Sequence, residues 1–186
     1  MFSSERRYHA IELFFWSASR LILSRQPSRY FVRVASLRRA AGGGFGMREM
    51  SAKWFEKSAS YDHAYGQFNF ALALQNGEGV AQDEARAATL LNKAANGECV
   101  EAVDAYGVAL WKGRGVPENP QAAFRYFLRA AEAGYPPAME NLSTCYRYGK
   151  GVKADERRSM EWKIRSRAAR GDRNAQAWLQ QNSKRK

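Results

Sequence analysis

Three copies of a Gly-x-Gly-Val motif recur in the sequence, as Gly77-Glu78-Gly79-Val80, Gly113-Arg114-Gly115-Val116 and Gly149-Lys150-Gly151-Val152. Successive copies are separated by 36 residues. A residue with an acid or amide side chain follows each copy at the same distance, at Asp83, Asn119 and Asp155. One Gly-x-Gly pair would be a weak signal, but a period shared by several residue types indicates an internal repeat. The sequence therefore predicts a stack of similar structural units.

Each unit is predicted to begin with a helix that leads into the glycine motif. This first helix carries large apolar residues four positions apart, which places them on one face: Phe70 and Leu74, Tyr106 and Leu110, Leu142 and Tyr146. The helix should end where Gly77, Gly113 or Gly149 adopts the left-handed backbone conformation, which a residue without a Cβ atom reaches at little cost.

A second helix is predicted to follow each glycine motif. Asp83, Asn119 and Asp155 stand where a side-chain oxygen can accept a hydrogen bond from a free backbone N–H at the start of a helix. Small residues recur along this helix and allow close approach to its neighbour. The larger residues expected to fill the core from the second helix are Leu90, Tyr126 and Trp162.

This pattern resembles the Sel-1-like repeat family, whose motif is A-x-x-x-L-G-x-x-Y-x-x-G-x-G-V-x-x-D followed by a helix that ends near A-A-x-x-G. The second copy matches it best, at Ala102, Tyr106, Gly107, Leu110, Gly113, Gly115, Val116, Asn119, Ala130, Ala131 and Gly134. The third matches at Ala138, Leu142, Ser143, Tyr146, Gly149, Gly151, Val152 and Asp155, and the first is looser. The resemblance implies an all-α fold, a short α-solenoid of antiparallel helical hairpins with about three Sel-1-like repeats and half-repeat caps.

The repeat divides the chain into four segments. We expect an Arg- and Ser-rich leader with a Gly-rich linker over 1–46, an N-terminal half-repeat helix over 47–61, three repeats over 62–172, and a capping helix with a basic tail over 173–186. Terminal repeats are expected to be atypical because they cover an exposed core face. The third repeat should have the more solvated second helix, because Lys163 stands at the position of Phe127 and Arg167 at that of Ala131.

The leader has the composition of a targeting segment. Residues 1–46 hold eight arginines, no lysine and two glutamates. An amphipathic, Arg-rich start of this kind is typical of a mitochondrial presequence and predicts a location in the mitochondrial matrix. The alternative is translation from Met47 or Met50, which predicts a cytoplasmic protein. Because no run of 18 apolar residues occurs, we expect no integral membrane segment.

The sequence offers no grouping of residues that indicates catalysis. His9 and His63 are the only histidines, and neither has a cysteine or a pair of carboxylates at ligand spacing. The two cysteines, Cys99 and Cys145, differ in register within their repeats by an offset that predicts free, packed thiols and no disulfide bond. We therefore predict no enzyme activity, no cofactor and no metal site.

A binding surface follows from the resemblance. Stacked hairpins create a concave groove lined by their first helices. The tetratricopeptide register implied by the family places Tyr65, Phe68, Leu72, Gln75, Glu101, Asp104, Val108, Trp111, Pro137, Glu140, Thr144 and Arg147 in it. This surface is apolar at one end, acidic in the middle and basic at Arg147, so a partner segment with an apolar anchor followed by Lys or Arg would complement it. The alternative for Phe68 and Leu72 is packing against the helix that contains Trp54.

Charge suggests a second class of function. The chain has a formal net charge of +12, but residues 60–146 hold ten acidic and six basic residues, while residues 147–186 hold thirteen basic and four acidic ones. The candidate contacts to a polyanion are Arg157, Arg158, Arg165, Arg170 and Arg173. The principal prediction is a scaffold or adaptor that binds protein partners during assembly of a multiprotein complex. One alternative is an accessory protein that contacts RNA or the ribosome through this basic region. The basic region could equally meet an acidic protein or face only solvent.

Overall fold

The computed structural model describes residues 45–183, and the predictions made for the leader and for the basic tail beyond residue 183 lie outside these residues. Within 45–183 the chain forms α-helices and no strand. The helices are α3 (Phe45–Ser60), α4 (Ala64–Asn76), α5 (Glu84–Asn96), α6 (Val100–Lys112), α7 (Pro120–Glu132), α8 (Pro136–Tyr148), α9 (Glu156–Ala169) and α10 (Arg173–Ser183).

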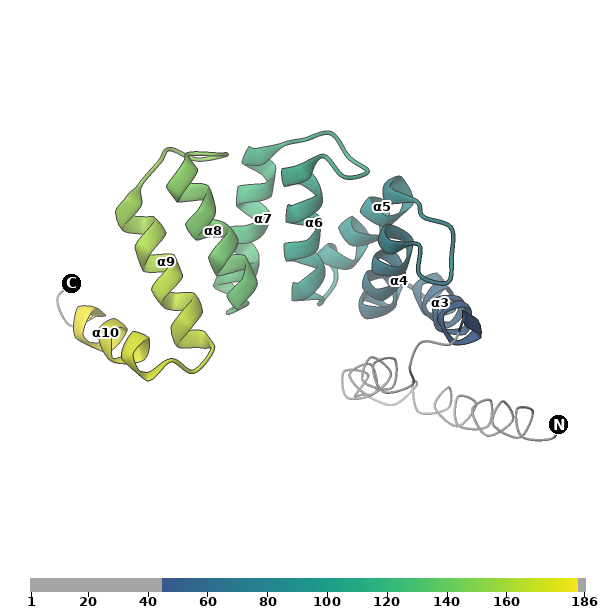
Figure 1. The fold of residues 1–186 in the computed structure, drawn as a ribbon, viewed down its shortest axis with the longest axis horizontal. Helices are drawn as coiled ribbons and strands as arrows, with labels where there is room; N and C mark the ends of the chain where they lie inside the picture. The colour runs from purple at the N-terminus through teal and green to yellow at the C-terminus, as the bar shows by residue number, and fades with distance from the viewer. Residues whose placement is uncertain (1–44, 184–186) are drawn as a thin grey trace. The chain divides into compact units, whose positions relative to one another are not determined.

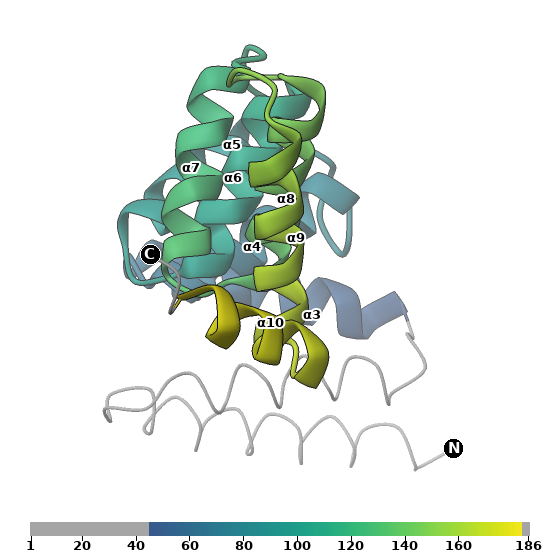
Figure 2. The ribbon, with the colours of Figure 1, turned by 90° about the vertical axis from the view of Figure 1, so that its left-hand side faces the viewer.

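The helices follow one another in chain order (Figure 1), and each packs mainly against the helix before it and the helix after it. Helices α4, α6 and α8 are the first helices of the three repeats, and α5, α7 and α9 are the second helices. Figure 2 views the array from the end at which α9 and α10 lie. The predicted all-α solenoid of helical hairpins is confirmed.

The two glycines of each motif serve different purposes. Gly77, Gly113 and Gly149 end the first helices with φ values of 65°, 68° and 64°, in the left-handed region as predicted. The second glycine is needed for a different reason, which Gly115 illustrates. A Cβ atom on Gly115 would overlap the carbonyl oxygen of Glu84, at the start of the second helix of the preceding repeat. The motif therefore recurs because each loop lies directly on the backbone of the neighbouring repeat.

The predicted caps of the second helices are present. The side chain of Asp83 accepts a hydrogen bond from the backbone N–H of Arg86 at 2.9 Å, and Asn119 accepts one from Ala122 at 2.9 Å. Asp155 does the same with Arg158 at 3.0 Å. Each of these bonds satisfies one backbone donor that has no partner within its helix.

In the second helices α5 and α7, the residues that fill the core lie one position after the predicted ones. Leu90 and Tyr126 are only half-buried, whereas the next residues, Leu91 and Phe127, are 0% and 2% exposed. Successive helical residues point about 100° apart, so only one of each pair can face the first helix directly. For Phe127 this position is created by a small residue on the facing helix, because a Cβ atom at Gly107 would lie 2.8 Å from its ring.

Polar contacts replace apolar packing in α9. Its buried residues are Ser159, Ser166 and Ala168, and both Lys163 and Arg167 are exposed, as the sequence predicted. Ser159 donates a hydrogen bond to the backbone carbonyl of Ser143 at 2.8 Å. Because serines bury less apolar area than Leu or Phe, α9 gains less from the hydrophobic effect than α5 or α7 does.

The cysteines are buried and unbonded, as predicted. Cys99 and Cys145 are each 0% exposed and carry free thiols. Burial raises the pKa of both thiols to about 12. A thiol that stays protonated at neutral pH is a poor nucleophile, so both cysteines serve as small apolar packing residues.

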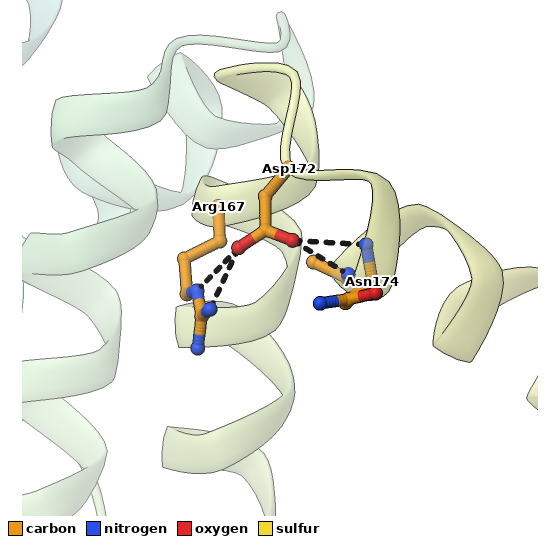
Figure 3. Close-up of polar contacts among 4 residues, drawn as sticks. Arg167, Asp172 and Asn174 are labelled. Atoms are coloured by element: carbon orange, nitrogen blue, oxygen red, sulfur yellow. Dashed lines mark hydrogen bonds and ion pairs between the residues drawn. The ribbon is translucent and has the colours of Figure 1, made fainter.

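The Asp172 carboxylate links helix α10 to α9, in addition to a hydrogen bond from the Gln176 side chain to the carbonyl of Ala168. One oxygen of Asp172 accepts hydrogen bonds from the backbone N–H groups of Asn174 and Ala175 at 3.0 and 3.1 Å (Figure 3). The other oxygen pairs with the guanidinium of Arg167 at 2.6 Å. These hydrogen bonds, from Ala175 first and then from Arg167, lower the pKa of Asp172. Asp172 thus caps α10 and ties it to α9.

Candidate partner-binding site

The predicted groove residues come from α4, α6 and α8, and we call the surface they form the first-helix face. On α4, Tyr65, Phe68, Leu72 and Gln75 are all half-buried. Tyr65 and Phe68 pack against the main core cluster, which α5, α6, α7 and α8 provide together. Phe68 therefore has apolar partners on the side of the next repeat. Packing of Phe68 and Leu72 against the helix that contains Trp54 stays a prediction.

On α6 the predicted residues range from half-buried to buried. Glu101, Val108 and Trp111 are half-buried, whereas Asp104 is 9% exposed. One oxygen of the Asp104 carboxylate accepts a hydrogen bond at 2.8 Å from the side-chain amide of Asn141 on α8. Burial raises the pKa of Asp104, and the bond from Asn141 acts in the opposite direction.

Trp111 contacts both the core and the next repeat. Its ring centroid is 6.2 Å from that of Phe127, and it packs against the main core cluster. The ammonium group of Lys150, in the glycine motif of the next repeat, lies 4.6 Å from the centroid of the Trp111 ring. Trp111 thus joins two repeats as well as contributing to the surface.

On α8 the predicted residues are the most accessible. Pro137 is half-buried, and Glu140, Thr144 and Arg147 are exposed. Glu140 is already engaged, because its carboxylate pairs with Arg170 at 2.9 Å and accepts a hydrogen bond from Ser166 at 3.2 Å. Thr144 and Arg147 are also exposed, and the Thr144 hydroxyl donates only to the backbone carbonyl of Glu140 within its own helix.

Two tyrosines on or near this face escaped the sequence prediction. Tyr135 precedes α8, is half-buried against the core cluster, and lies outside the helical positions that the family register covers. Its phenol pKa is raised by burial and then by the charges of Asp104 and Glu101. Tyr148 is 71% exposed and directly follows the predicted Arg147.

Charge is distributed along the first helices from one end to the other. Glu98, Glu101 and Asp104 lie at or near the beginning of α6, and Lys112 ends it. Arg147 and Lys150 lie at the corresponding end of α8. The first-helix face is therefore acidic where α6 begins and basic where α6 and α8 end, and Lys150 at the basic end already pairs with Glu118 at 2.8 Å.

Most of the described chain matches a known family of repeats. Residues 48–62, 64–98, 100–135 and 136–162 match a family described as Sel1 repeat, and together they make up more than half of the chain. The chain belongs to the Sel1 repeat family. Sel1 repeats generally serve as modules for protein–protein interaction and are typically not catalytic. The resemblance seen in the sequence is confirmed.

Several solved structures resemble this Sel1 repeat protein. A Sel1 repeat protein from Oxalobacter formigenes is 32% identical with a TM-score of 0.63, over 71% of this chain and 54% of that one. A protective antigen present in uropathogenic Escherichia coli strains, with an SLR fold, is 27% identical with a TM-score of 0.61, over 69% of this chain and 27% of that one. The chain thus spans about half the length of the first protein and about a quarter of the second.

A more distant likeness concerns the fold alone. Cysteine rich protein B of Helicobacter pylori is 16% identical with a TM-score of 0.54, over 73% of this chain and 97% of that one. No curated protein sequence matches this Sel1 repeat protein.

The basic region of the Sel1 repeat protein is largely engaged in internal contacts. Arg158 pairs with Asp155 at 3.4 Å, Arg165 with Glu161 at 2.6 Å, and Arg170 with Glu140 at 2.9 Å. The remaining two predicted contacts, Arg157 and Arg173, are exposed and form no ion pair within the described part of the chain. The structure therefore brings the five arginines to α9 and the start of α10 without leaving all of them available.

The described part of the Sel1 repeat protein comprises residues 45–183. These residues contain no group of three or more His, Cys, Asp or Glu side chains able to hold a metal ion. No helix among them is long and apolar enough to cross a membrane.

Proposed function

We propose that this Sel1 repeat protein is a non-enzymatic scaffold or adaptor in the assembly of a multiprotein complex, and that it binds a segment of a partner protein along the first-helix face. The supporting observation is the combination on one face of half-buried apolar side chains with an acidic end and a basic end. Phe68, Leu72 and Val108 retain accessible apolar area. Binding a partner there would remove this area from water.

The experiment uses two threonines as a matched pair. Thr144 on α8 and Thr89 on α5 are both exposed, and each donates its hydroxyl to the carbonyl four residues earlier at 3.0 Å. Only Thr144 belongs to the first-helix face. Full-length wild-type protein and the Thr144→Arg and Thr89→Arg variants are used to capture partners from cells, followed by mass spectrometry.

We expect Thr144→Arg to lose proteins that wild type captures, because a bulky charge blocks the face, and Thr89→Arg to retain them. Equal capture by all three proteins would show that partners bind elsewhere. Helical circular dichroism of each variant verifies that the fold persists. A captured fraction that consists of RNA, and that dissociates as salt is raised, would instead support the basic region as the binding surface.

The location of the protein is a separate proposal that rests on composition. We propose that the Arg-rich residues 1–46 direct the chain to the mitochondrial matrix. Organelle fractionation combined with sequencing of the mature N-terminus tests it. A shortened chain in the mitochondrial fraction is expected, and a cytosolic chain beginning at Met47 or Met50 would contradict it.

A further inference from the structure

Helix α9 differs from the other second helices in what lies beside it. Helices α5 and α7 each pack against the first helix of the next repeat, α6 or α8. Figures 1 and 2 show α10 at the C-terminal end of α9, so that no described helix follows beside the N-terminal half of α9. The side of α9 that corresponds to the repeat interface of α7 is therefore open along this half.

An exposed apolar side chain lies at an interface position on this side. Met160 comes one period of 36 residues after Phe124, whose ring meets that of Tyr146 on the next repeat edge-on, with centroids 5.4 Å apart. Met160 is 54% exposed. The counterpart of Tyr146 on α10 is Asn182, whose side-chain amide donates to the carbonyl of Trp178 in its own helix. Met160 thus lacks the aromatic partner that Phe124 has.

Basic and apolar residues surround Met160 on the same side of the helix. Arg157 and Lys163 stand three residues before and after it, and Ile164 stands four residues after it, which are the spacings of neighbours on a helix surface. Arg157 and Lys163 are exposed, and Ile164 is half-buried. We call Arg157, Met160, Lys163 and Ile164 together the α9 end face. It has an apolar centre with a cation on either side.

The two cations of the α9 end face have no acidic partner within the described part of the chain. The ion pairs that α9 forms there use other residues, namely Arg158, Arg165 and Arg167. An acidic residue, Glu156, precedes Arg157, and it lies in the first turn of α9, where the helix dipole stabilises a carboxylate. The α9 end face is therefore suited to an anionic partner.

A polar end cap would account for the cations but leaves Met160 unexplained. The terminal units of a repeat array carry polar side chains on their outer side, which keeps the array soluble. Lys163, at the position of Phe127, fits this purpose. An unbranched methionine adapts its shape to a partner, and methionine and arginine are both enriched at protein interfaces. Met160 between Arg157 and Lys163 therefore favours a surface that a partner covers.

We infer that the α9 end face binds a helix of a partner protein that carries large apolar side chains on one side and Asp or Glu next to them. This helix would lie beside α9 as α8 lies beside α7, because the ridges of one helix fit the grooves of another. Its apolar side chains would cover Met160 and Ile164, and its carboxylates would pair with Arg157 and Lys163. The site is separate from the first-helix face and goes beyond the proposed function.

The experiment uses fluorescent, covalently stabilised helical peptides of about 15 residues, a length at which an unsupported helix is marginal. Three peptides have leucines on one side, flanked by Glu, by Gln or by Lys, and a fourth keeps the Glu residues but has Ser in place of Leu. Fluorescence anisotropy measures binding to the full-length protein. We expect the Glu/Leu peptide to bind best and the Lys/Leu peptide worst. Replacing Leu by Ser should weaken binding roughly tenfold or more.

A charge reversal tests the assigned surface. The Arg157→Glu/Lys163→Glu variant should bind the Lys/Leu peptide more tightly than the Glu/Leu peptide, and a gain of binding of this kind cannot arise from unfolding. The Met160→Gln variant should bind the Glu/Leu peptide more weakly than wild type does, because it removes apolar contact.

The matched control changes net charge equally on the preceding second helices. Lys93 on α5 and Arg125 on α7 are exposed, and neither forms an ion pair among residues 45–183. The Lys93→Glu/Arg125→Glu variant should retain the wild-type preference for the Glu/Leu peptide. The same reversal of preference in this control would attribute the effect to overall charge and overturn the proposal.

Three further outcomes would also overturn it. Absence of binding to every peptide would show that the α9 end face is only a solvated cap. Equal binding of the Glu/Leu and Glu/Ser peptides would show charge attraction without helix docking. Binding of a labelled single-stranded RNA, but of no peptide, would assign the basic residues of α9 to RNA instead.

Discussion

At the scale of single residues, Asp104 shows how a side chain that is unremarkable in the sequence becomes unusual in the fold. In the sequence it is one acid among ten in the acidic middle of the chain. In the structure it is buried, bonded to one neutral amide and without a counter-ion among the described residues. Its carboxylate therefore lowers stability at neutral pH.

The pH dependence of this effect has a definite sign. The pKa of Asp104 in the folded protein is raised above its ordinary value of 3.8, so the unfolded chain gives up this proton more readily than the folded chain. Stability is therefore lost as pH rises from about 4 through the folded-state pKa. At pH 7 we expect Asp104→Asn to be more stable than wild type by an amount of order 1 kcal/mol, and this difference should shrink toward about pH 4.

Urea denaturation of both proteins across this pH range measures the difference. Glu132→Gln serves as the control, because it removes an exposed carboxylate and should change stability little at any pH. If Asp104→Asn were clearly less stable than wild type at pH 7, the carboxylate would have a stabilising partner, and burial would not be the dominant effect on its pKa.

At the scale of elements, the glycine motif links neighbouring repeats through backbone packing. Gly113 and Gly115 both have positive φ values, of 68° and 69°. They differ in their surroundings. A Cβ atom at Gly113 would meet Glu118 at an ordinary 3.5 Å, whereas one at Gly115 would overlap the backbone of Glu84.

This difference predicts unequal effects of the same substitution. Gly113→Ala should cost about 1 kcal/mol, because only the left-handed conformation penalises it. Gly115→Ala should cost about 3 kcal/mol or more, since the loop must also move away from α5. Chemical denaturation monitored by circular dichroism measures both. Equal effects of the two substitutions would mean that the contact between the loop and α5 contributes nothing to stability.

At the scale of the whole array, stability depends on the contacts that each helix makes with its neighbours. In a repeat protein, the free energy of unfolding is approximately a sum of local terms and nearest-neighbour interfaces. Helices α6 and α7 have neighbours on both sides, and they contribute half of the residues in the main buried cluster. Helix α9 buries two serines and one alanine, and α10 packs mainly against α9.

Amide hydrogen exchange should reveal this gradient. We expect amides of α9 and α10 to exchange at least about tenfold faster than those of α6 and α7, after correction for intrinsic rates. Local opening at one end breaks fewer interfaces than opening in the middle. Uniform protection from α4 to α10 would instead indicate that the array unfolds as one cooperative unit.

Prediction from sequence succeeded where a residue acts on its own segment. The left-handed glycines and the caps at Asp83, Asn119 and Asp155 follow from local backbone chemistry. Prediction failed by one position in the second helices, where Leu91 and Phe127 occupy the core sites expected for Leu90 and Tyr126. Adjacent positions on a helix look alike in an apolar pattern, and only the facing helix selects between them.

The sequence by itself determined that this protein is a stack of helical hairpins. The caps and the first glycines set the ends of each helix through local backbone chemistry, and the period of 36 residues repeats the same hairpin along the chain. The tertiary structure alone decided that Asp104 became buried and which arginines found acidic partners, such as Arg170 with Glu140. Contacts between repeats join residues more than thirty positions apart. Their strength depends on the distance and burial that stacking creates, and no local pattern encodes these quantities.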